Sequence, residues 1–243
     1  MTQPKEIELH VGHYGDGTGA RGYVDEVQYA RKFIKRIYDI LVANKVPTTF
    51  YEDEVSKNQT QNINNLIMHH NVDRNGLIVS GHLNSTSSLT DRPIGVEVLY
   101  STQKDLAAAV AKAMCDVSGL LNRGAKYRDN IGVLTRTYEP SILTEFGFVN
   151  SKKDVELMDK HFEAICQVIA KVLAVHIGYK ISDKKEEVLV VQPTYVKDAA
   201  PAPWAIEAVE WAKANGISDG TFLKRPATRE EVITMLHNAL NKK

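Results

Sequence analysis

Residues 9–26 read LHVGHYGDGTGARGYVDE, and this stretch joins an apolar, strand-like run to a helix-like run. Within it, GTGARG at 17–22 fits the dinucleotide-binding pattern G-x-G-x-x-G letter for letter. His13 and Glu26, residue types that bind metals, stand towards its two ends. The stretch therefore predicts a strand–loop–helix unit of an α/β protein, with two competing functions for the loop.

The surroundings of the glycines argue against the dinucleotide-binding function. In that fold the motif starts at the end of the first strand, and the helix begins within the motif. Here about a dozen residues separate the expected strand end near Val11 from the helix start near Val24. The dinucleotide-binding motif also needs an acidic residue roughly 20 residues further on, at the end of a second strand. The candidate here, Glu52, lies 30 residues past Gly22. We therefore favour the alternative, in which the loop brings its two end residues to one metal.

From residue 7 to about 178, strand-like and helix-like segments mostly alternate. This alternation predicts an α/β fold with a mixed, mostly parallel sheet flanked by helices. The expected strands are 7–11, 48–53, 76–82, 95–100, 131–136 and 141–148. The expected helices, with apolar residues at helical spacing, are 27–41, 59–70, 103–121 and 152–176.

Composition changes at about residue 179, which predicts a large domain (1–178), a linker (179–202) and a small all-α domain (203–243). The linker combines a cluster of charges with prolines. Two helices are expected after it, from 204 to about 215 and from 229 to about 241. Thr228 and Glu231 fit a capping box at the second helix. Two such helices bury too little surface to be stable alone, so we expect the tail to pack on the large domain or on a second copy.

Charge and length exclude several classes of protein. The 243 residues carry 30 Lys and Arg against 30 Asp and Glu, which argues against a nucleic-acid binder or a polybasic membrane protein. No stretch approaches the roughly 18–20 apolar residues of a membrane span. The first residues lack the apolar segment of a secretory signal, so we expect synthesis in the cytoplasm.

Cys115 and Cys166 lie among apolar residues in helical patterns and are expected to be buried free thiols.

Four residues suggest a metal centre at one edge of the sheet. His13 follows a strand, Glu26 begins the next helix and His82 ends the strand 76–82. Open α/β sheets bind their ligands at this edge. Two imidazoles and one carboxylate suit zinc and leave a fourth position for water. Glu145, in the strand 141–148, is a candidate to accept a proton from that water.

Each of these residues also has a plainer interpretation. His13 alone fits a turn, and Glu26 alone fits a first-turn acid favoured by the helix dipole. His82 alone fits a hydrogen-bonding residue at a strand end. Glu145 stands in an apolar run, where a carboxylate is costly unless it is paired or used. Asn84 is a candidate to hydrogen-bond a substrate, with a turn-forming role as the alternative.

Four blocks of the sequence resemble the zinc-dependent N-acetylmuramoyl-L-alanine amidases, the family of many bacterial autolysins and phage endolysins. The blocks are VGHYGDGTGARGYVDE (11–26), LIVSGHLNS (77–85), IGVEVLY (94–100) and SILTEFGFVNSKKD (141–154). The resemblance extends from residue 7 to about 178. It implies that His13, Glu26 and His82 bind Zn²⁺ and that Glu145 is the catalytic glutamate. The implied reaction is hydrolysis of peptidoglycan, by zinc-activated water, at the amide between N-acetylmuramic acid and L-alanine.

Residues 58–71 and 123–128 look most like the phage endolysin branch of that family. The resemblance thus implies a bacteriophage endolysin that is made in the host cytoplasm and acts on the cell wall after release. A host autolysin of the same chemistry and a non-catalytic peptidoglycan-binding protein are the alternatives.

The sequence departs from the family at His10, where an acidic residue is common, and at Tyr14, where a second glycine is common. We expect His10 to be structural or to support the site, and a direct role near the metal stays open. The other histidines lack a partner pattern and are expected on the surface or in helix packing: His69, His70, His161, His176 and His237.

Residues 203–240 resemble a shortened S-layer homology motif, with a helix opening at tryptophan, the turn GISDGTF and the helix start TREE. Such motifs bind secondary polymers of the Gram-positive wall, usually as three copies, and one is present here. The resemblance implies a wall-targeting module that pairs with a second chain as a homodimer. The alternative is a packing or dimerisation element without a ligand.

Overall fold

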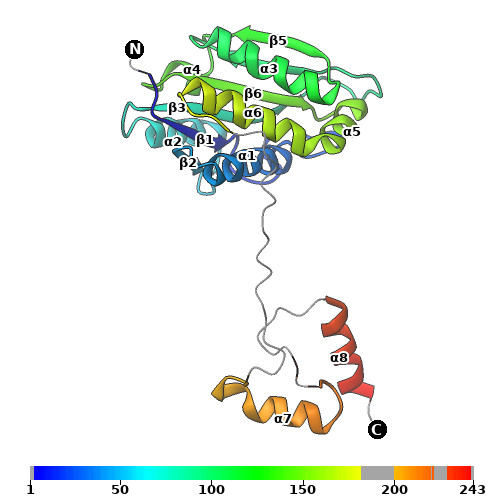
Figure 1. The fold of residues 1–243 in the computed structure, drawn as a ribbon. Helices are drawn as coiled ribbons and strands as arrows, with labels where there is room; N and C mark the ends of the chain where they lie inside the picture. Colours follow the sequence, from blue (N-terminus) through cyan, green and yellow to red (C-terminus); the bar gives the residue numbers. More distant parts are fainter. Residues whose placement is uncertain (1–2, 182–199, 220, 222–228, 242–243) are drawn as a thin grey trace. The chain divides into compact units, whose positions relative to one another are not determined.

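The strand expected at 7–11 is β1 (Glu6–Val11), the second strand in a six-stranded sheet of the computed structural model (Figure 1). The structure describes residues 3–181, 200–219, 221 and 229–241. Strand order is β2-β1-β3-β6-β4-β5, and only the β4–β6 pair among these is antiparallel. The mixed, mostly parallel sheet is thereby confirmed. The other strands are β2 (Thr48–Tyr51), β3 (Gly76–Asn84), β4 (Val96–Tyr100), β5 (Asn122–Tyr127) and β6 (Ser141–Phe148).

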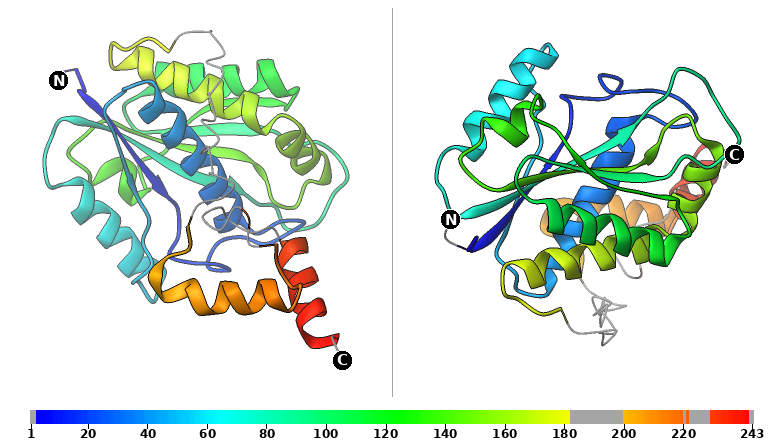
Figure 2. Two further views of the ribbon diagram at one scale, coloured as in Figure 1. Left: turned by 60° about the horizontal axis from the view of Figure 1, so that its bottom comes forward. Right: turned by 90° about the horizontal axis from the view of Figure 1, so that it is seen from above.

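Three helices cover one face of the sheet: α1 (Glu26–Ala43), α3 (Lys104–Ser118) and α6 (Phe162–His176) (Figures 1 and 2). In α1, Asp25 caps the first turn by accepting hydrogen bonds from the backbone N–H groups of the second and third residues. The apolar stripe of α1 packs on the sheet, where Phe33 stacks on Phe146 of β6 with ring centroids 4.5 Å apart. This face holds the main hydrophobic core.

The opposite face is covered by α2 (Gln59–His70) and the short α4 (Gly132–Thr135). A small apolar cluster lies there, around Leu66 of α2 and Leu143 of β6. Leu9 of β1 and Gly81 of β3 face the main core and α1. Because side chains alternate along a strand, the residues next to them face α2 instead. Polar side chains of three strands therefore share the α2 side: Glu8, His10, Ser80, His82 and Glu145.

Two expected elements were wrong. The stretch 131–136, expected as a strand, contains the helix α4, and the sixth strand is instead the polar β5. β5 lies at the edge of the sheet with its residues exposed or half-buried, so it lacks the apolar pattern of a central strand. The helix expected over 152–176 is two helices, α5 (Lys152–Lys160) and α6, separated at His161.

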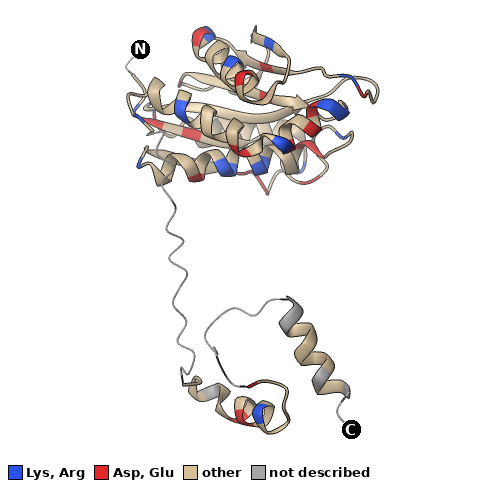
Figure 3. Ribbon diagram, turned by 45° about the vertical axis from the view of Figure 1, so that its right-hand side comes forward, with Lys and Arg blue, Asp and Glu red and all other residues tan. Residues whose placement is uncertain are grey.

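The two cysteines are free thiols, as expected. Cys166 of α6 is buried, and burial raises the pKa of its thiol. Cys115 of α3 is only half-buried, so the expectation of full burial is wrong for this residue. Lys and Arg are interspersed with Asp and Glu on helices α1, α3 and α5 (Figure 3).

The chain divides into two units, Met1–Ser182 and Asp183–Lys243. In the second unit, a 3₁₀ turn (Pro203–Ala205) leads into α7 (Ile206–Ala214), and α8 spans Arg229–Asn241. Most of the expected linker, and the threonine of the expected capping box, lie outside the described residues. Within the described part of the chain, no helix is both long enough and apolar enough to cross a membrane.

Candidate metal centre and active site

His13, Glu26 and His82 come together at the carboxyl ends of β1 and β3. Nε2 of His13 and Nδ1 of His82 each lie 2.9 Å from Oε1 of Glu26. One donor atom from each of the three residues lies within 4.8 Å of the other two. Two imidazole nitrogens and one carboxylate oxygen at this spacing can converge on one tetrahedral ion, so the set fits zinc.

The topology explains why residues so distant in sequence meet. β1 and β3 are parallel neighbours, and the N–H of Gly12 donates to the carbonyl of Gly81 at 2.9 Å, so both strands end at one edge. Gly12 allows the close approach that follows, because a Cβ there would overlap the imidazole of His82. The loop 12–25 then returns the chain to the same edge, where α1 starts.

Glu26 is fixed in place by backbone donors. The N–H of Ala20 donates to Oε2 at 2.7 Å, and the N–H of Leu83 donates to Oε1 at 3.3 Å. Burial opposes ionisation of this carboxyl. The hydrogen bonds with His13 and His82 outweigh that effect and hold the pKa of Glu26 well below its usual range. The site therefore presents a charged carboxylate between two imidazoles.

Helix α2 holds His13 from the other side. Nδ1 of His13 lies 3.3 Å from Oε1 of Gln59, and Nδ2 of Asn62 donates to the carbonyl of His13 at 2.9 Å. Asn62 also donates to Asp53 at 2.9 Å. His13 has a φ of 67°, a conformation that costs energy in a non-glycine residue and needs such support. Sequence reasoning missed Gln59 and Asn62, because their contacts with His13 depend on how α2 packs beside the loop.

Glu145 lies in β6 as the register partner of His82 in β3, and of Glu97 in the antiparallel strand β4. Oε2 of Glu145 is buried without a hydrogen-bond partner among the residues that the structure describes. Burial, with the charges of Glu26 and Glu97, raises the pKa of Glu145 to about 8. A carboxyl group of this kind can exchange a proton near neutral pH.

Glu97 is the centre of a small polar network that sequence reasoning did not single out. Asn84 donates to its Oε1 at 2.9 Å, and Nε of Arg123 donates to its Oε2 at 2.9 Å. Asn84, predicted to contact a substrate, thus directs its amide nitrogen to Glu97. An amide nitrogen carries two hydrogens, so one N–H remains to reach a second acceptor.

A second buried network lies under α2. Nε2 of His70 lies 2.8 Å from Nδ1 of His10, and Nδ1 of His70 lies 2.5 Å from Oε2 of Glu8. All three residues are buried. His70 was expected on the surface or in helix packing; it lies buried where α2 packs on the sheet, with polar partners on β1 that the sequence did not reveal. His10 connects to this network, as a structural role requires.

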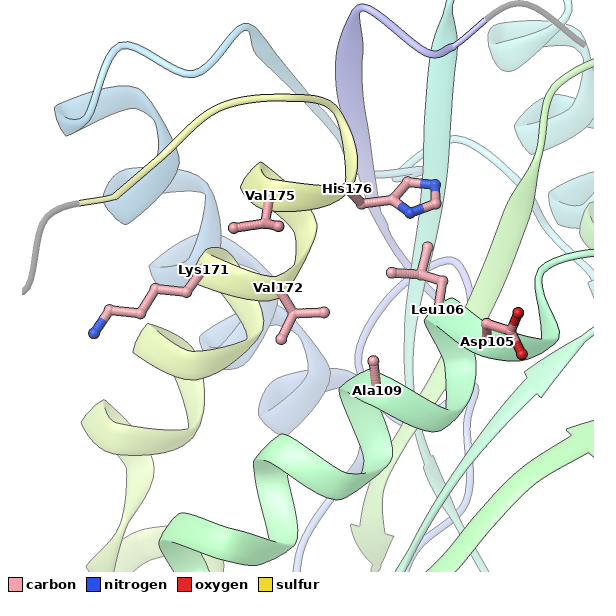
Figure 4. Close-up of a pocket in the computed structure, with 7 residues that line it drawn as sticks. All are labelled: Asp105, Leu106, Ala109, Lys171, Val172, Val175 and His176. Carbon is pink, nitrogen blue, oxygen red and sulfur yellow. The ribbon is translucent and has the colours of Figure 1, made fainter.

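An apolar pocket between α3 and α6 lies apart from the candidate site. Leu106 and Ala109 line it on one side, and Val172 and Val175 line it on the other (Figure 4). No candidate metal ligand lines it, and neither does Glu145.

Comparisons with known proteins agree on the fold. The catalytic domain of the CD27L endolysin, described as targeting Clostridia difficile, superposes with a TM-score of 0.64 at 24% identity, covering 73% of this chain and 99% of that one. The amidase CwlD of Clostridioides difficile, solved with the GerS lipoprotein, gives 0.62 at 21% identity, covering 71% and 98%. The catalytic domain of the amidase CwlV of Bacillus (Paenibacillus) polymyxa gives 0.58 at 23% identity, covering 72% and 99%.

Sequence comparison adds a relative and a family. An uncharacterized 38.4 kDa protein of Clostridium perfringens is 25% identical over 193 residues, which are 75% of this chain and 55% of that protein. The chain thus spans about half the length of the curated relative that it matches. The model of the N-acetylmuramoyl-L-alanine amidase family matches residues 7–175, which include all four candidate site residues. The chain therefore belongs to the N-acetylmuramoyl-L-alanine amidase family.

Proposed function

We propose that this protein is a zinc-dependent amidase that hydrolyses peptidoglycan between N-acetylmuramic acid and L-alanine. One observation carries the proposal: a His–Glu–His cluster lies beside Glu145, a carboxyl group on the neighbouring strand with its Oε2 buried and without a hydrogen-bond partner among the described residues. Membership of the amidase family supports the choice of substrate bond.

In this mechanism His13, Glu26 and His82 hold the zinc ion. Zinc supplies Lewis acidity, which polarises the amide carbonyl and makes water a stronger nucleophile at neutral pH. Glu145 accepts a proton from the attacking water and returns it to the leaving nitrogen of L-alanine. With zinc bound, the nearby cation would favour the carboxylate form of Glu145, so a larger fraction of this group would be ready to accept a proton at neutral pH.

The network around Glu97 prepares Glu145 for this exchange. The negative charge of Glu97 contributes to the raised pKa of Glu145, which helps Glu145 to hold the proton until the amine leaves. Asn84 positions Glu97 with one N–H and donates the other to a substrate oxygen.

Lysis of purified peptidoglycan with and without a chelator tests the catalytic proposal. The turbidity of the suspension should fall with the zinc-loaded protein, stay constant after chelation and fall again when zinc is restored. A non-catalytic peptidoglycan-binding protein would sediment with the walls and leave the turbidity unchanged under all three conditions. That result would refute the proposal.

We propose further that the protein acts as a bacteriophage endolysin, made in the cytoplasm and active on the wall after release. The sequence resemblance of residues 58–71 and 123–128 to that branch supports this role. Expression in a Gram-positive host should leave growth intact until a pore-forming agent breaches the membrane, and lysis should follow at once. Lysis without that agent would favour an exported host autolysin.

For residues 203–243 we propose a wall-binding module on a linker of residues 179–202, paired with a second chain. The helices leave apolar side chains in solvent: Trp211 of α7 is 57% exposed and Leu240 of α8 is 80% exposed. A Glu145→Gln full chain should sediment with Gram-positive walls, and the same variant ending at residue 182 should not. Light scattering should give a dimer for the full chain and a monomer for the shortened one. If both chains sedimented with the walls to the same extent and had the same oligomeric state, residues 203–243 would have no wall-binding or dimerising role.

A further inference from the structure

A second group of acidic side chains lies at the edge of the sheet opposite the candidate metal centre. Glu6 and Glu8 are on β1, Asp73 lies between α2 and β3, and Glu139 comes just before β6. Glu6 pairs with Gly76, the first residue of β3, so these groups surround the amino ends of the parallel strands. One oxygen each from Glu6, Glu8 and Asp73 lies within 4.8 Å of the other two.

Glu139 adds a fourth carboxylate from inside the protein. It is 5% exposed, its Oε1 accepts a hydrogen bond from the N–H of Gly76 at 2.6 Å, and the neighbouring Glu8 and Asp73 contribute to its raised pKa. Oε2 of Glu139 is buried and has no donor among the described residues. A Cβ on Gly76 would contact both Glu8 and Glu139, so glycine keeps the space between the two carboxylates open. Buried polar atoms normally have a partner, and a bound ion is one explanation for an atom that has none. The unpaired Oε2 of Glu139, which lies among carboxylates, therefore calls for a positive partner.

The described part of the chain offers these carboxylates no Lys or Arg ion pair. The nearby Arg74 places its guanidinium 4.0 Å over the ring of Tyr138. His70 contacts Glu8, but burial lowers the pKa of His70 to about 4, which leaves it neutral at physiological pH. Burial and the neighbouring acids raise the pKa values of Glu8 and Glu139 to about 7. The negative charge of the cluster is thus uncompensated above neutral pH.

We propose that Glu6, Glu8, Asp73 and Glu139 form a second metal site, which binds a hard divalent cation of the Ca²⁺ type. All the donors are carboxylate oxygens, which Ca²⁺ prefers, whereas zinc sites draw on imidazole or thiolate. Calcium–oxygen distances are about 2.3–2.6 Å, so ligands on opposite sides of one ion lie about 4.6–5.2 Å apart. The oxygens of Glu6, Glu8 and Asp73 lie within 4.8 Å of one another, so no pair of them is too far apart to share one ion. Asp73 is exposed and Glu6 half-buried, so an ion can enter from solvent.

The site is independent of the amidase reaction, and its test needs no activity measurement. The zinc-loaded full chain is titrated with CaCl₂ at about pH 8 by calorimetry, and its melting temperature is recorded in parallel. Saturable binding with a dissociation constant below about 1 mM and a rise in melting temperature are expected. No heat of binding and no shift up to about 10 mM Ca²⁺ would overturn the proposal.

Two substitutions and a control locate the site. Asp73→Asn, at an exposed position, should weaken Ca²⁺ binding at least about tenfold. Glu139→Gln should abolish it and raise the melting temperature of the Ca²⁺-free protein, because one uncompensated charge is removed. Glu54→Gln, an exposed acid outside the cluster, should bind Ca²⁺ like the unaltered chain. Unchanged affinity in both cluster variants would refute the site, as would stabilisation by acid alone with no response to Ca²⁺, which would indicate carboxyl groups sharing a proton.

Discussion

Glu145 lies directly opposite His82 in the parallel β3–β6 pair, on the same face of the sheet. Adjacent strands are about 4.8 Å apart, so this register places the candidate base beside a candidate metal ligand without any loop between them. Side chains on paired strands are held more firmly than side chains on loops. Two of the four groups in the proposed chemistry, His82 and Glu145, therefore lie on paired strands of the sheet.

Glu145→Gln should reduce the rate of peptidoglycan hydrolysis by about a thousandfold or more, because it removes the proton acceptor and donor. Glutamine has nearly the same shape and carries no charge, so it suits the buried position. Zinc content and melting temperature should stay at or above those of the unaltered chain. Near-normal hydrolysis by this variant would show that Glu145 is not the catalytic proton acceptor and donor.

His82→Ala should lose zinc, because two protein ligands hold the ion far more weakly than three. Gly12→Ala should have a similar effect by displacing the His82 ring, although no ligand is changed. Metal analysis after dialysis measures both variants, and circular dichroism reports whether the fold persists. Full zinc occupancy in folded His82→Ala would exclude this histidine as a ligand.

His70→Ala should lower the free energy of unfolding by about 2–4 kcal/mol, because it leaves Glu8 and His10 buried without their shared partner. The adjacent His69 is a matched control. Its ring stacks on Tyr51 at 3.9 Å, so His69→Ala should cost about 1 kcal/mol or less. Urea denaturation measures both losses, and equal losses would show that the buried network contributes nothing specific.

Stability in the absence of Ca²⁺ should fall as the pH rises through about 7. The folded-state pKa values of Glu8 and Glu139 lie near 7, above their ordinary value of 4.5, so the folded state binds protons more tightly than the unfolded chain. The stabilisation from these protons is complete below about pH 4.5 and is lost as both groups ionise. Melting temperatures between about pH 5 and 8 should decline less steeply in Glu139→Gln. Identical slopes would contradict the raised pKa values.

The sequence predicted most of the fold because the central strands and the core helices carry clear apolar patterns. Strands β1, β3, β4 and β6, together with helices α1 and α3, lie close to their expected ranges. β5 was missed because an edge strand needs no apolar side chains, and its sequence NRGAKY is mostly polar. The separation of α5 from α6 depends on the backbone at His161, which fits the helical pattern of the sequence on both sides.

The candidate site was predicted as a set of residues but without its supporting contacts. Ligand-type side chains at strand ends and a helix start are visible in sequence, and the resemblance to a family joined them. The partners Gln59, Asn62 and Glu97 were not visible, because each contact depends on how α2 and β4 pack against the sheet. His70 shows the same limit, since only the fold places β1 under α2.

The bond that is cut tests the proposed function most directly. Purified peptidoglycan is digested with the zinc-loaded full chain, and new amino-terminal alanine and new reducing sugar ends are counted in the same digest. An amidase releases one amino-terminal alanine per cleavage and leaves the number of reducing ends constant. New reducing ends without new amino-terminal alanine would show cleavage of the glycan strand instead and would contradict the assignment.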